Sequence, residues 1–126
     1  MTKAEYRLEG DFDERLALLE AGMGDGATLV ESSDFGEGGA RCAVRVFARH
    51  SMVRGERTSL CITLFSAGGR ALHLSAVAIG DSRAASLKIS ARSEKSFLEA
   101  LNELLLGCTE AFADEEDETK QRRRGN

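Results

Sequence analysis

The residues of this chain that could do covalent chemistry are a cysteine and a histidine, Cys61 and His73. A cysteine nucleophile needs a histidine within hydrogen-bond reach, a group that orients the histidine, and an oxyanion site. A turn at residues 66–70 would set Thr63 opposite His73, with Cys61 two positions away on the same strand face. That diagonal of about 7–8 Å strains the required reach, and the two strands carry no carboxylate. A small Cys/His enzyme is therefore a remote alternative, and we expect no catalytic residues.

The glycine-rich stretch GMGDG at residues 22–26 invites comparison with a phosphate-binding loop. Such a loop follows a strand and opens a helix, so that backbone N–H groups and the helix dipole meet the anion. Here the glycines close an expected helix and precede an expected strand. This order is typical of a helix terminator followed by a turn.

No residues in the sequence have the spacing of a metal site. The two histidines and three cysteines occur singly, whereas zinc sites present their ligands in closely spaced pairs. Cys42 and Cys108 are small enough to be core residues, and His50 would end a strand near solvent. We therefore expect no metal and no cofactor.

Three arginines spaced along one expected strand are the most suggestive residues for binding. In the stretch RCAVRVFARH at residues 41–50, Arg41, Arg45 and Arg49 share one side. The other side of this strand is apolar and consists of Cys42, Val44, Val46 and Ala48. A period of two is typical of a half-buried strand, which predicts that the arginines lie on the outer, polar face of a sheet. The expected neighbours on that face are Ser59, Cys61, Thr63 and His73.

Two aromatic residues, Phe47 and Phe65, interrupt this polar face. Aromatic residues among arginines are enriched at protein interfaces, whereas a solvated outer face is common in antiparallel sheets. Compared with the docking of another protein, a merely solvated face is the simpler interpretation. Self-association as a homodimer is the alternative that we keep. The expected interface residues of that dimer are Arg41, Arg45, Phe47, Arg49 and Phe65.

The elements that must position these residues are four expected strands between residues 41 and 91. Their expected ranges are 41–50, 57–66, 70–79 and 87–91. The loops between them are short, and because a parallel crossover needs a dozen or more residues, the strands must be antiparallel neighbours. Two further strand candidates lie upstream, at residues 3–9 and 27–33.

Two helices are expected to cover the apolar face of this sheet. Asp11 is spaced as the N-cap of a first helix, which ends at Gly22 or Gly24. Apolar residues at helical spacing predict a second helix, with Ser93 or Ser96 as its cap. The sequence therefore predicts an α+β fold, with an antiparallel sheet of about five to six strands in the order β-α-β-β-β-β-β-α and both helices on one face.

The length and the distribution of charge predict one domain and a tail. The chain has 126 residues, of which 42% are hydrophobic, and this is enough for a single buried core. We place the domain at residues 1–107. Residues 114–118 are five consecutive acids and residues 120–124 include four basic side chains. Because such charge blocks bury too little surface to offset chain entropy, we expect residues 108–126 to be a disordered tail.

The composition also limits the partners that we expect. The formal net charge of −4 gives no general attraction to nucleic acid. No apolar run approaches the roughly 20 residues of a membrane-spanning helix, and the N-terminus lacks the apolar core of a signal peptide. The three cysteines follow no disulfide pattern and argue for a reducing compartment. We expect a cytoplasmic protein without nucleic-acid or membrane partners.

Two consecutive segments carry a resemblance to a known family. The stretches VRVFARHS at residues 44–51 and RTSLCITLF at residues 57–65 resemble the central hairpin of a family of short, uncharacterised bacterial proteins. Later segments, SAVAIGDS at 75–82 and the Phe97-Leu98 pair, are similar to that family as well. The resemblance covers most of residues 6–106 and implies no activity, because the family is described as a domain of unknown function. By its order of elements the chain also resembles the helix-grip architecture, in which a curved sheet wraps the last helix and leaves an apolar cavity.

These observations favour a non-enzymatic binding module that holds a small apolar ligand between the sheet and the last helix. The residues expected to line this ligand site are Leu60, Ile62, Leu64, Leu72, Leu74, Phe97 and Leu101. Solid packing of the same side chains is the competing interpretation.

Overall fold

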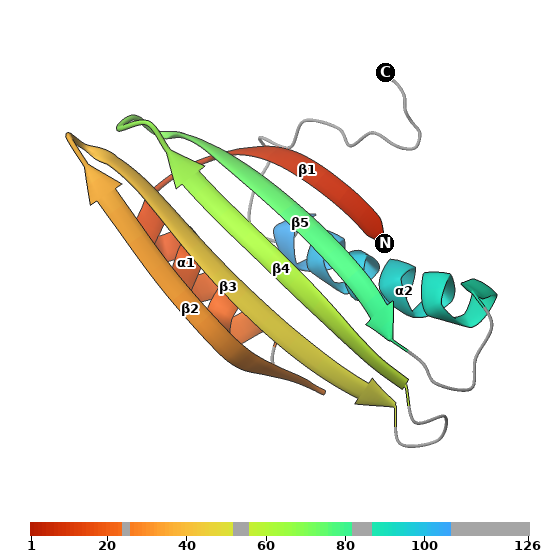
Figure 1. Ribbon diagram of the computed structural model, residues 1–126. Coiled ribbons are helices and arrows are strands. Elements are labelled where there is room, and N and C mark those ends of the chain that lie inside the picture. The colour runs from red at the N-terminus through yellow and green to blue at the C-terminus, as the bar shows by residue number, and fades with distance from the viewer. Residues whose placement is uncertain (24–25, 52–55, 82–86, 107–126) are drawn as a thin grey trace.

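The computed structural model describes residues 1–23, 26–51, 56–81 and 87–106, without the side chains of residues 51, 56, 81 and 87–93. These residues form one five-stranded sheet and two helices (Figure 1). The elements in chain order are β1 (Thr2–Glu9), α1 (Phe12–Gly22), β2 (Ala27–Glu37), β3 (Ala40–Ser51), β4 (Glu56–Ser66), β5 (Ala71–Asp81) and α2 (Leu87–Leu106). The predicted α+β fold is confirmed. The predicted C-terminal tail lies outside the described residues.

The strands are antiparallel throughout and lie in the order β1-β5-β4-β3-β2. The predicted meander through β3, β4 and β5 is confirmed. The sequence did not place β1, which returns to the far edge of the sheet and pairs with β5, with Tyr6 opposite Leu74. The turn between β4 and β5 contains Gly68 at φ 127°, a conformation that residues with a side chain rarely adopt. β4 is thus the middle strand, and β1 and β2 are the two edges.

One of the six predicted strands is not formed. Residues 87–91, which alternate like a strand, form the first part of α2. Five residues of alternation are too few to distinguish a strand from the start of a helix. The 20-residue helix is fixed by its later part, where Phe97, Leu101 and Leu105 lie on one side and are buried.

The first helix begins as its sequence predicts. The Asp11 side chain accepts a hydrogen bond from the Glu14 backbone N–H at 3.0 Å, which is the N-cap contact that compensates a free helix N–H group. The helix ends at Gly22, one of its two expected ends. Phe12, Leu16 and Leu19 recur at intervals of four and three residues and are its buried side chains.

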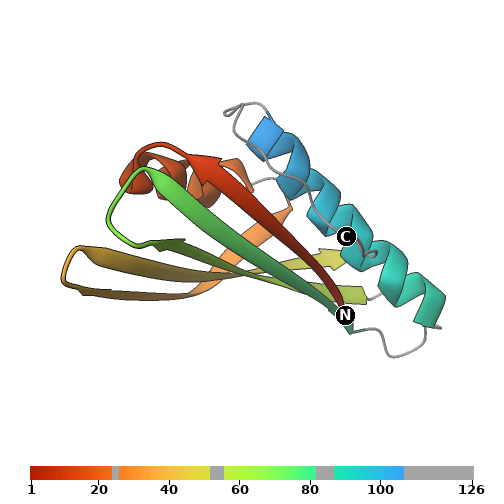
Figure 2. The ribbon, with the colours of Figure 1, turned by 90° about the horizontal axis from the view of Figure 1, so that it is seen from above.

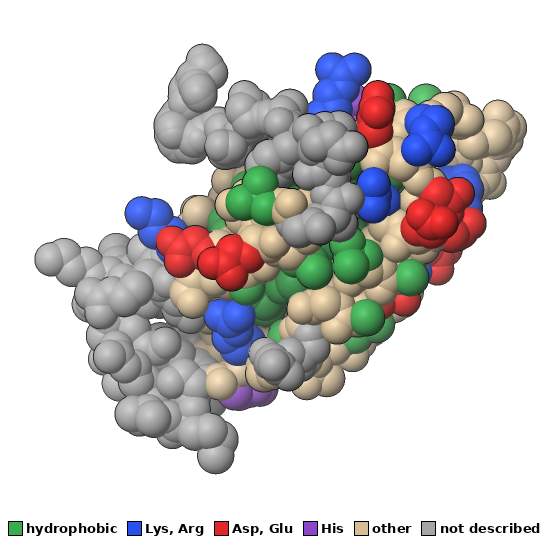
Figure 3. All heavy atoms as spheres, turned by 180° about the vertical axis from the view of Figure 1, so that it is seen from behind, with side chains coloured by type: hydrophobic (Ala, Val, Ile, Leu, Met, Phe, Trp, Pro, Cys, Tyr) green, Lys and Arg blue, Asp and Glu red, His purple; other side chains and the backbone are tan. Residues whose placement is uncertain are grey.

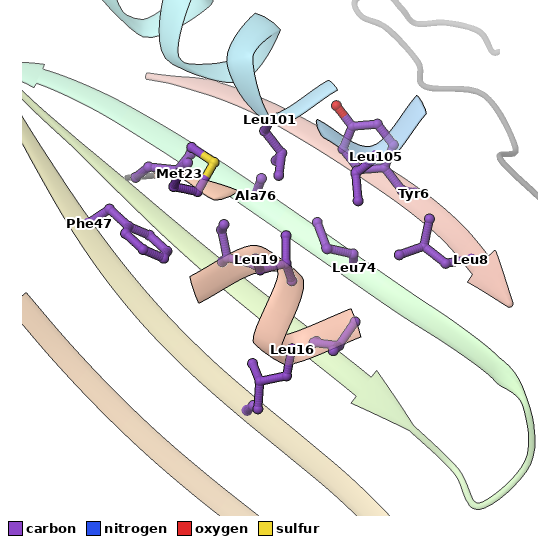
Figure 4. Packing of buried hydrophobic residues seen from close by; sticks show 14 of the residues in the cluster. Tyr6, Leu8, Leu16, Leu19, Met23, Phe47, Leu74, Ala76, Leu101 and Leu105 are labelled. Atoms are coloured by element: carbon purple, nitrogen blue, oxygen red, sulfur yellow. The ribbon is translucent and has the colours of Figure 1, made fainter. Parts of the chain in front are cut away.

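Both helices lie on the same side of the sheet, as Figure 2 shows. Seen from that side, acidic and basic side chains are spread over the surface with hydrophobic side chains between them (Figure 3). The core lies between the helices and the sheet. In Figure 4, Leu16 and Leu19 of α1 and Leu101 and Leu105 of α2 pack toward the sheet, near Leu74 and Ala76. The fold therefore has two layers, with one face of the sheet covered by the described helices.

A buried carboxylate joins α2 to two strands. Glu94 is 3% exposed and accepts hydrogen bonds from the Thr2 hydroxyl at 2.6 Å and the Gly80 N–H at 2.8 Å. The terminal ammonium of Met1 lies 3.1 Å away. Burial by itself raises the pKa of Glu94, but the Thr2 and Gly80 hydrogen bonds and the ammonium outweigh it and hold this pKa below its ordinary value of 4.5.

Replacing this carboxylate is expected to remove a pH-dependent part of the stability. Because the folded-state pKa of Glu94 lies below the unfolded one, its contribution is complete above the ordinary pKa and is lost as the pH falls through the lower, folded value. We expect Glu94→Gln to lower the free energy of unfolding by about 1–3 kcal/mol at pH 7 and by much less at pH 3. Urea unfolding across this pH range measures the difference. Glu99→Gln, at an exposed position of the same helix, should show no such dependence, and an equal loss at both pH values for Glu94→Gln would contradict the assignment.

Candidate functional site

The seven residues expected to line a ligand site do come together in the structure. Each of them is 2% exposed or less, and all belong to one cluster of buried side chains: Leu60, Ile62, Leu64, Leu72, Leu74, Phe97 and Leu101. They fill the space between β4, β5 and α2 as a packed core. A ligand there would have to displace these side chains, and its binding stays a prediction.

The predicted orientation of β3 is wrong. Its arginines share a face with the core of β4, since Arg45 pairs with Ile62 and Phe47 pairs with Leu60. Arg45 and Phe47 are 6% and 2% exposed. The expected dimer surface therefore does not exist as one face: Arg41, Arg45, Phe47 and Arg49 lie on the helix-covered side, and Phe65 lies on the opposite side.

Arg45 is the centre of a polar network beneath α1. Its guanidinium donates to the Glu20 carboxylate at 2.7 Å and to the Asp34 carboxylate at 3.0 Å. It also donates to the backbone carbonyls of Ser33 and Val44. Burial by itself lowers the pKa of Arg45, and the hydrogen bonds to the two carboxylates outweigh it and raise this pKa above its ordinary value. The network ties α1, β2 and β3 together.

The flanking arginines make similar contacts with the helices. Arg41 forms two hydrogen bonds of 2.9 Å with Asp13, and its guanidinium lies 4.3 Å from the centre of the Phe12 ring. Hydrogen bonding to Arg41 lowers the pKa of Asp13. Arg49 lies 4.3 Å over the ring of Phe97, and burial lowers its pKa. The three arginines thus attach the sheet to the helices through ion pairs and cation–π contacts.

The Cys61–His73 pair, kept as a remote alternative, is not formed either. His73 lies opposite Phe65 and Cys61 lies opposite Val77. The cysteine and the histidine are therefore four positions apart along adjacent strands, about 13 Å in that direction alone. This separation exceeds the reach of proton transfer between the two side chains. In the described part of the chain, no three His, Cys, Asp or Glu side chains are placed to hold a metal ion.

The side of the sheet away from α1 and α2, called here the outer face, is covered by neither of the described helices (Figure 1). The strand register aligns its side chains in rows that cross all five strands. One row consists of Arg7, His73, Phe65, Cys42 and Phe35. A second row consists of Lys3, Val77, Cys61, Val46 and Glu31. Each row is apolar in the middle and charged at one or both ends.

The middle of the outer face carries both apolar and hydroxyl side chains, and its edges are charged, because Thr63 and Ser75 lie opposite one another in the row between the two rows above, with Val44 and Glu5 as their other neighbours. The apolar centre is defined by Val44, Val46, Cys61, Phe65 and Val77, all on β3, β4 and β5. The charged rim lies on the edge strands and consists of Lys3, Glu5, Arg7 and Glu9 on β1 and Glu31 and Glu37 on β2. An apolar centre with a polar rim is the usual composition of a protein interface.

Two open hollows flank the ring of Phe65, which is 40% exposed. One has a volume of about 490 Å³ and is bordered by Arg7, Thr63 and His73. The other has a volume of about 520 Å³ and is bordered by Phe35 and Cys42. The His73 ring is tilted by 41° against Phe65, with the ring centres 6.3 Å apart. Phe65 therefore stands between two depressions that can accept protruding side chains.

Sequence reasoning missed this face because it assigned Val44 and Val46 to the core. A signal was present, since Phe47 has the same parity as the three arginines and a large aromatic residue belongs in a core. A second signal lies in α1, whose Asp13 and Glu20 are about 10.5 Å apart along the helix. That spacing is close to the about 13 Å between Arg41 and Arg45.

Comparison with known proteins identifies a family for this chain but gives no activity. A family model described as "Family of unknown function (DUF6054)" matches residues 1–108. No curated protein and no solved structure gives a match, so the likeness to the helix-grip architecture stays an expectation. None of the described helices is long and apolar enough to cross a membrane.

Proposed function

The chain belongs to this family of unknown function, and from that premise we propose that it is a non-enzymatic association module whose outer face binds a second copy of the chain. The observation that carries the proposal is the apolar centre of the outer face, which neither of the described helices covers. Isolated apolar residues on a protein surface need no explanation, but a continuous apolar patch with a polar rim is typical of an interaction site. Here the apolar side chains lie on three adjacent strands, with the hydroxyls of Thr63 and Ser75 among them.

The size of the outer face supports a protein partner. Strands lie about 4.8 Å apart and rise about 3.3 Å per residue, so five strands with 11 residues in β4 form a face of about 850 Å². A stable protein interface buries about 800 Å² on each partner. The face is therefore large enough for a standard interface without any contribution from the helices.

The charge of the outer face argues against nucleic acid as the partner. Its edge strands carry two cations, Lys3 and Arg7, and four acids, Glu5, Glu9, Glu31 and Glu37, and the exposed Arg57 of β4 adds a third cation to the face. Lys3 is already paired with Glu5 at 2.8 Å. Nucleic-acid binding is dominated by neutralisation of phosphates, and this surface offers no positive patch for it. A second copy fits better because its face has the same apolar centre and a rim with charges of both signs.

Introducing a charge at the centre of the outer face is expected to dissociate the dimer. Val46→Lys should weaken self-association at least about tenfold, because the ammonium would lose its hydration in the middle of the interface. Sedimentation equilibrium over a range of concentrations measures the dissociation constant, and circular dichroism shows whether the variant folds. Ala17→Lys adds the same charge at an exposed position of α1 and should dimerise like the wild type. A wild-type protein that stays monomeric, or an unchanged dissociation constant in Val46→Lys, would refute the proposal.

A further inference from the structure

We propose that the two copies stack their outer faces about a two-fold axis that runs along β4, and that charges on the edge strands select this arrangement. This inference rests on the proposed self-association. It places β1 of each copy over β2 of its partner, and β4 over β4. Lys3 and Glu31 then become residues that determine the specificity of the dimer.

Only a few arrangements of two identical sheets are compatible with regular packing. Stacked sheets keep their strand directions within about 30° of one another, and a self-complementary dimer has a two-fold axis. The axis can therefore run along the strands or across them. An axis across the strands stacks each strand on its own copy. An axis along the strands and through β4, the middle strand, reverses the order and stacks each edge on the opposite edge.

The edge charges distinguish these two arrangements. On β2 the outer-face charges are Glu31 and Glu37, and the strand Ala27–Glu37 contains no Lys or Arg. On β1 the outer-face charges alternate in sign and cancel. An axis across the strands would stack the acidic β2 edge on itself, which is unfavourable because like charges at an interface repel. An axis along β4 stacks the acidic edge on the neutral edge, which includes two cations.

The register adds a specific pair to this general argument. Lys3 and Glu31 occupy opposite ends of one cross-strand row, through Val77, Cys61 and Val46. A two-fold axis along β4 keeps the height along the strands, so it brings Lys3 of one copy over Glu31 of the other, twice per dimer. An edge strand lies about 10 Å from β4, so a rotation of about 30° between the two sheets moves it by about 5 Å, which a lysine side chain can span. In the same way Arg7 lies over Phe35 of the partner, a cation–π geometry.

The same row places one cysteine near the axis. Cys61 lies on β4, so the two copies of Cys61 face each other with backbones about 10 Å apart, the spacing of stacked sheets. Cys42 lies on β3, one strand from the axis, and its two copies are separated by a further lateral distance of about 10 Å. The two cysteines therefore differ in how readily a short reagent can join them across the dimer.

Cross-linking with a short bis-maleimide tests the position of the axis. In Cys42→Ser/Cys108→Ser protein the remaining Cys61 should give a covalent dimer, and in Cys61→Ser/Cys108→Ser protein the remaining Cys42 should react to a dimer at least about tenfold more slowly. Equal or faster cross-linking through Cys42 overturns the proposal. Sedimentation of the same samples separates the two levels of inference: a monomer refutes the self-association itself, and a dimer with the reversed cross-linking pattern refutes only the axis.

Charge reversal tests the specificity determinants. Lys3→Glu and Glu31→Lys should each weaken the dimer about threefold to tenfold, as expected for the loss of two exposed ion pairs. The double variant Lys3→Glu/Glu31→Lys should return to within about twofold of the wild type, because the pair is restored with opposite sign. A tighter dimer in Glu31→Lys alone overturns the proposal, since removing a self-repelling edge is the result expected for an axis across the strands.

Discussion

Replacing Leu101 by alanine is expected to lower the free energy of unfolding by about 2–5 kcal/mol. Leu101 lies on α2, is 0% exposed, and packs in the cluster that joins this helix to the sheet. Truncation removes apolar contacts and leaves a cavity that the neighbouring side chains fill only partly. Because a domain of this size is stable by about 5–15 kcal/mol in total, the variant loses a large share of its stability. Urea unfolding followed by circular dichroism measures the loss.

The matched control for this prediction lies on the same helix. Leu106 is 55% exposed, so Leu106→Ala removes the same atoms without opening a cavity. Its free energy of unfolding should stay within about 0.5 kcal/mol of the wild type. Similar losses for the two variants would mean that α2 is not packed on the sheet as described.

The second large effect is expected for Arg45→Glu. This change removes the donor that satisfies Glu20 and Asp34 and puts a third carboxylate beside them in a nearly buried position. Breaking a buried ion pair by removing one partner costs about 3–5 kcal/mol. Glu20 and Asp34 are partly exposed, with side chains 38% and 63% accessible, so we expect the lower end of this range. Urea unfolding at neutral pH measures the loss.

The exposed Arg70 provides the control for this change. Arg70→Glu makes the same reversal of charge in the turn before β5 and should leave the free energy of unfolding nearly unchanged. Arg45→Glu should behave as a destabilised protein and not as a folded monomer, because Arg45 faces α1 and not the outer face. A folded, stable Arg45→Glu protein that only fails to dimerise would restore the interface first predicted from the sequence.

Local signals made much of the fold predictable. The N-cap at Asp11, the apolar spacing of both helices, and the short turns between strands each depend on a few neighbouring residues, and these predictions are confirmed. The expected cap of the second helix at Ser93 or Ser96 is wrong, because that helix begins at Leu87. The pairing of β1 with β5 could not be predicted in this way. It joins residues 2–9 to residues 71–78, and no local pattern identifies the partner of an edge strand.

The orientation of β3 shows why alternation alone can mislead. The strand has arginines on one side and small apolar residues on the other, which favours burial of the apolar side. In the structure the arginine side faces the helices, because its guanidinium groups are paired with carboxylates and aromatic rings of the helices. The aliphatic parts of arginine side chains can cover apolar surface while their charged ends find partners. The parity of Phe47 and the spacing of Asp13 and Glu20 indicate this arrangement, and the contacts of the arginines with Asp13, Glu20 and Phe97 establish it.

The error in the Cys61–His73 register has a similar origin. The sequence prediction centred the β4–β5 turn on Gly68 and set Thr63 opposite His73, whereas the structure pairs Ser66 with Leu72 and Thr63 with Ser75. Moving the centre of a turn by one residue moves every cross-strand partner by two. The sequence of the turn allows both positions, so the distance between a cysteine and a histidine on these strands could not be fixed without the structure.

The measurement that most directly tests the central proposal is the alkylation rate of Cys42 and Cys61 as a function of protein concentration. Both are free cysteines on the outer face, and in Cys108→Ser protein they report on that face alone. If the outer face binds a second copy, the alkylation rates of both thiols fall together as the concentration passes the dissociation constant of the dimer. Rates that stay constant while sedimentation shows a dimer would mean that the copies associate through another surface, and the proposed role of the outer face would be wrong.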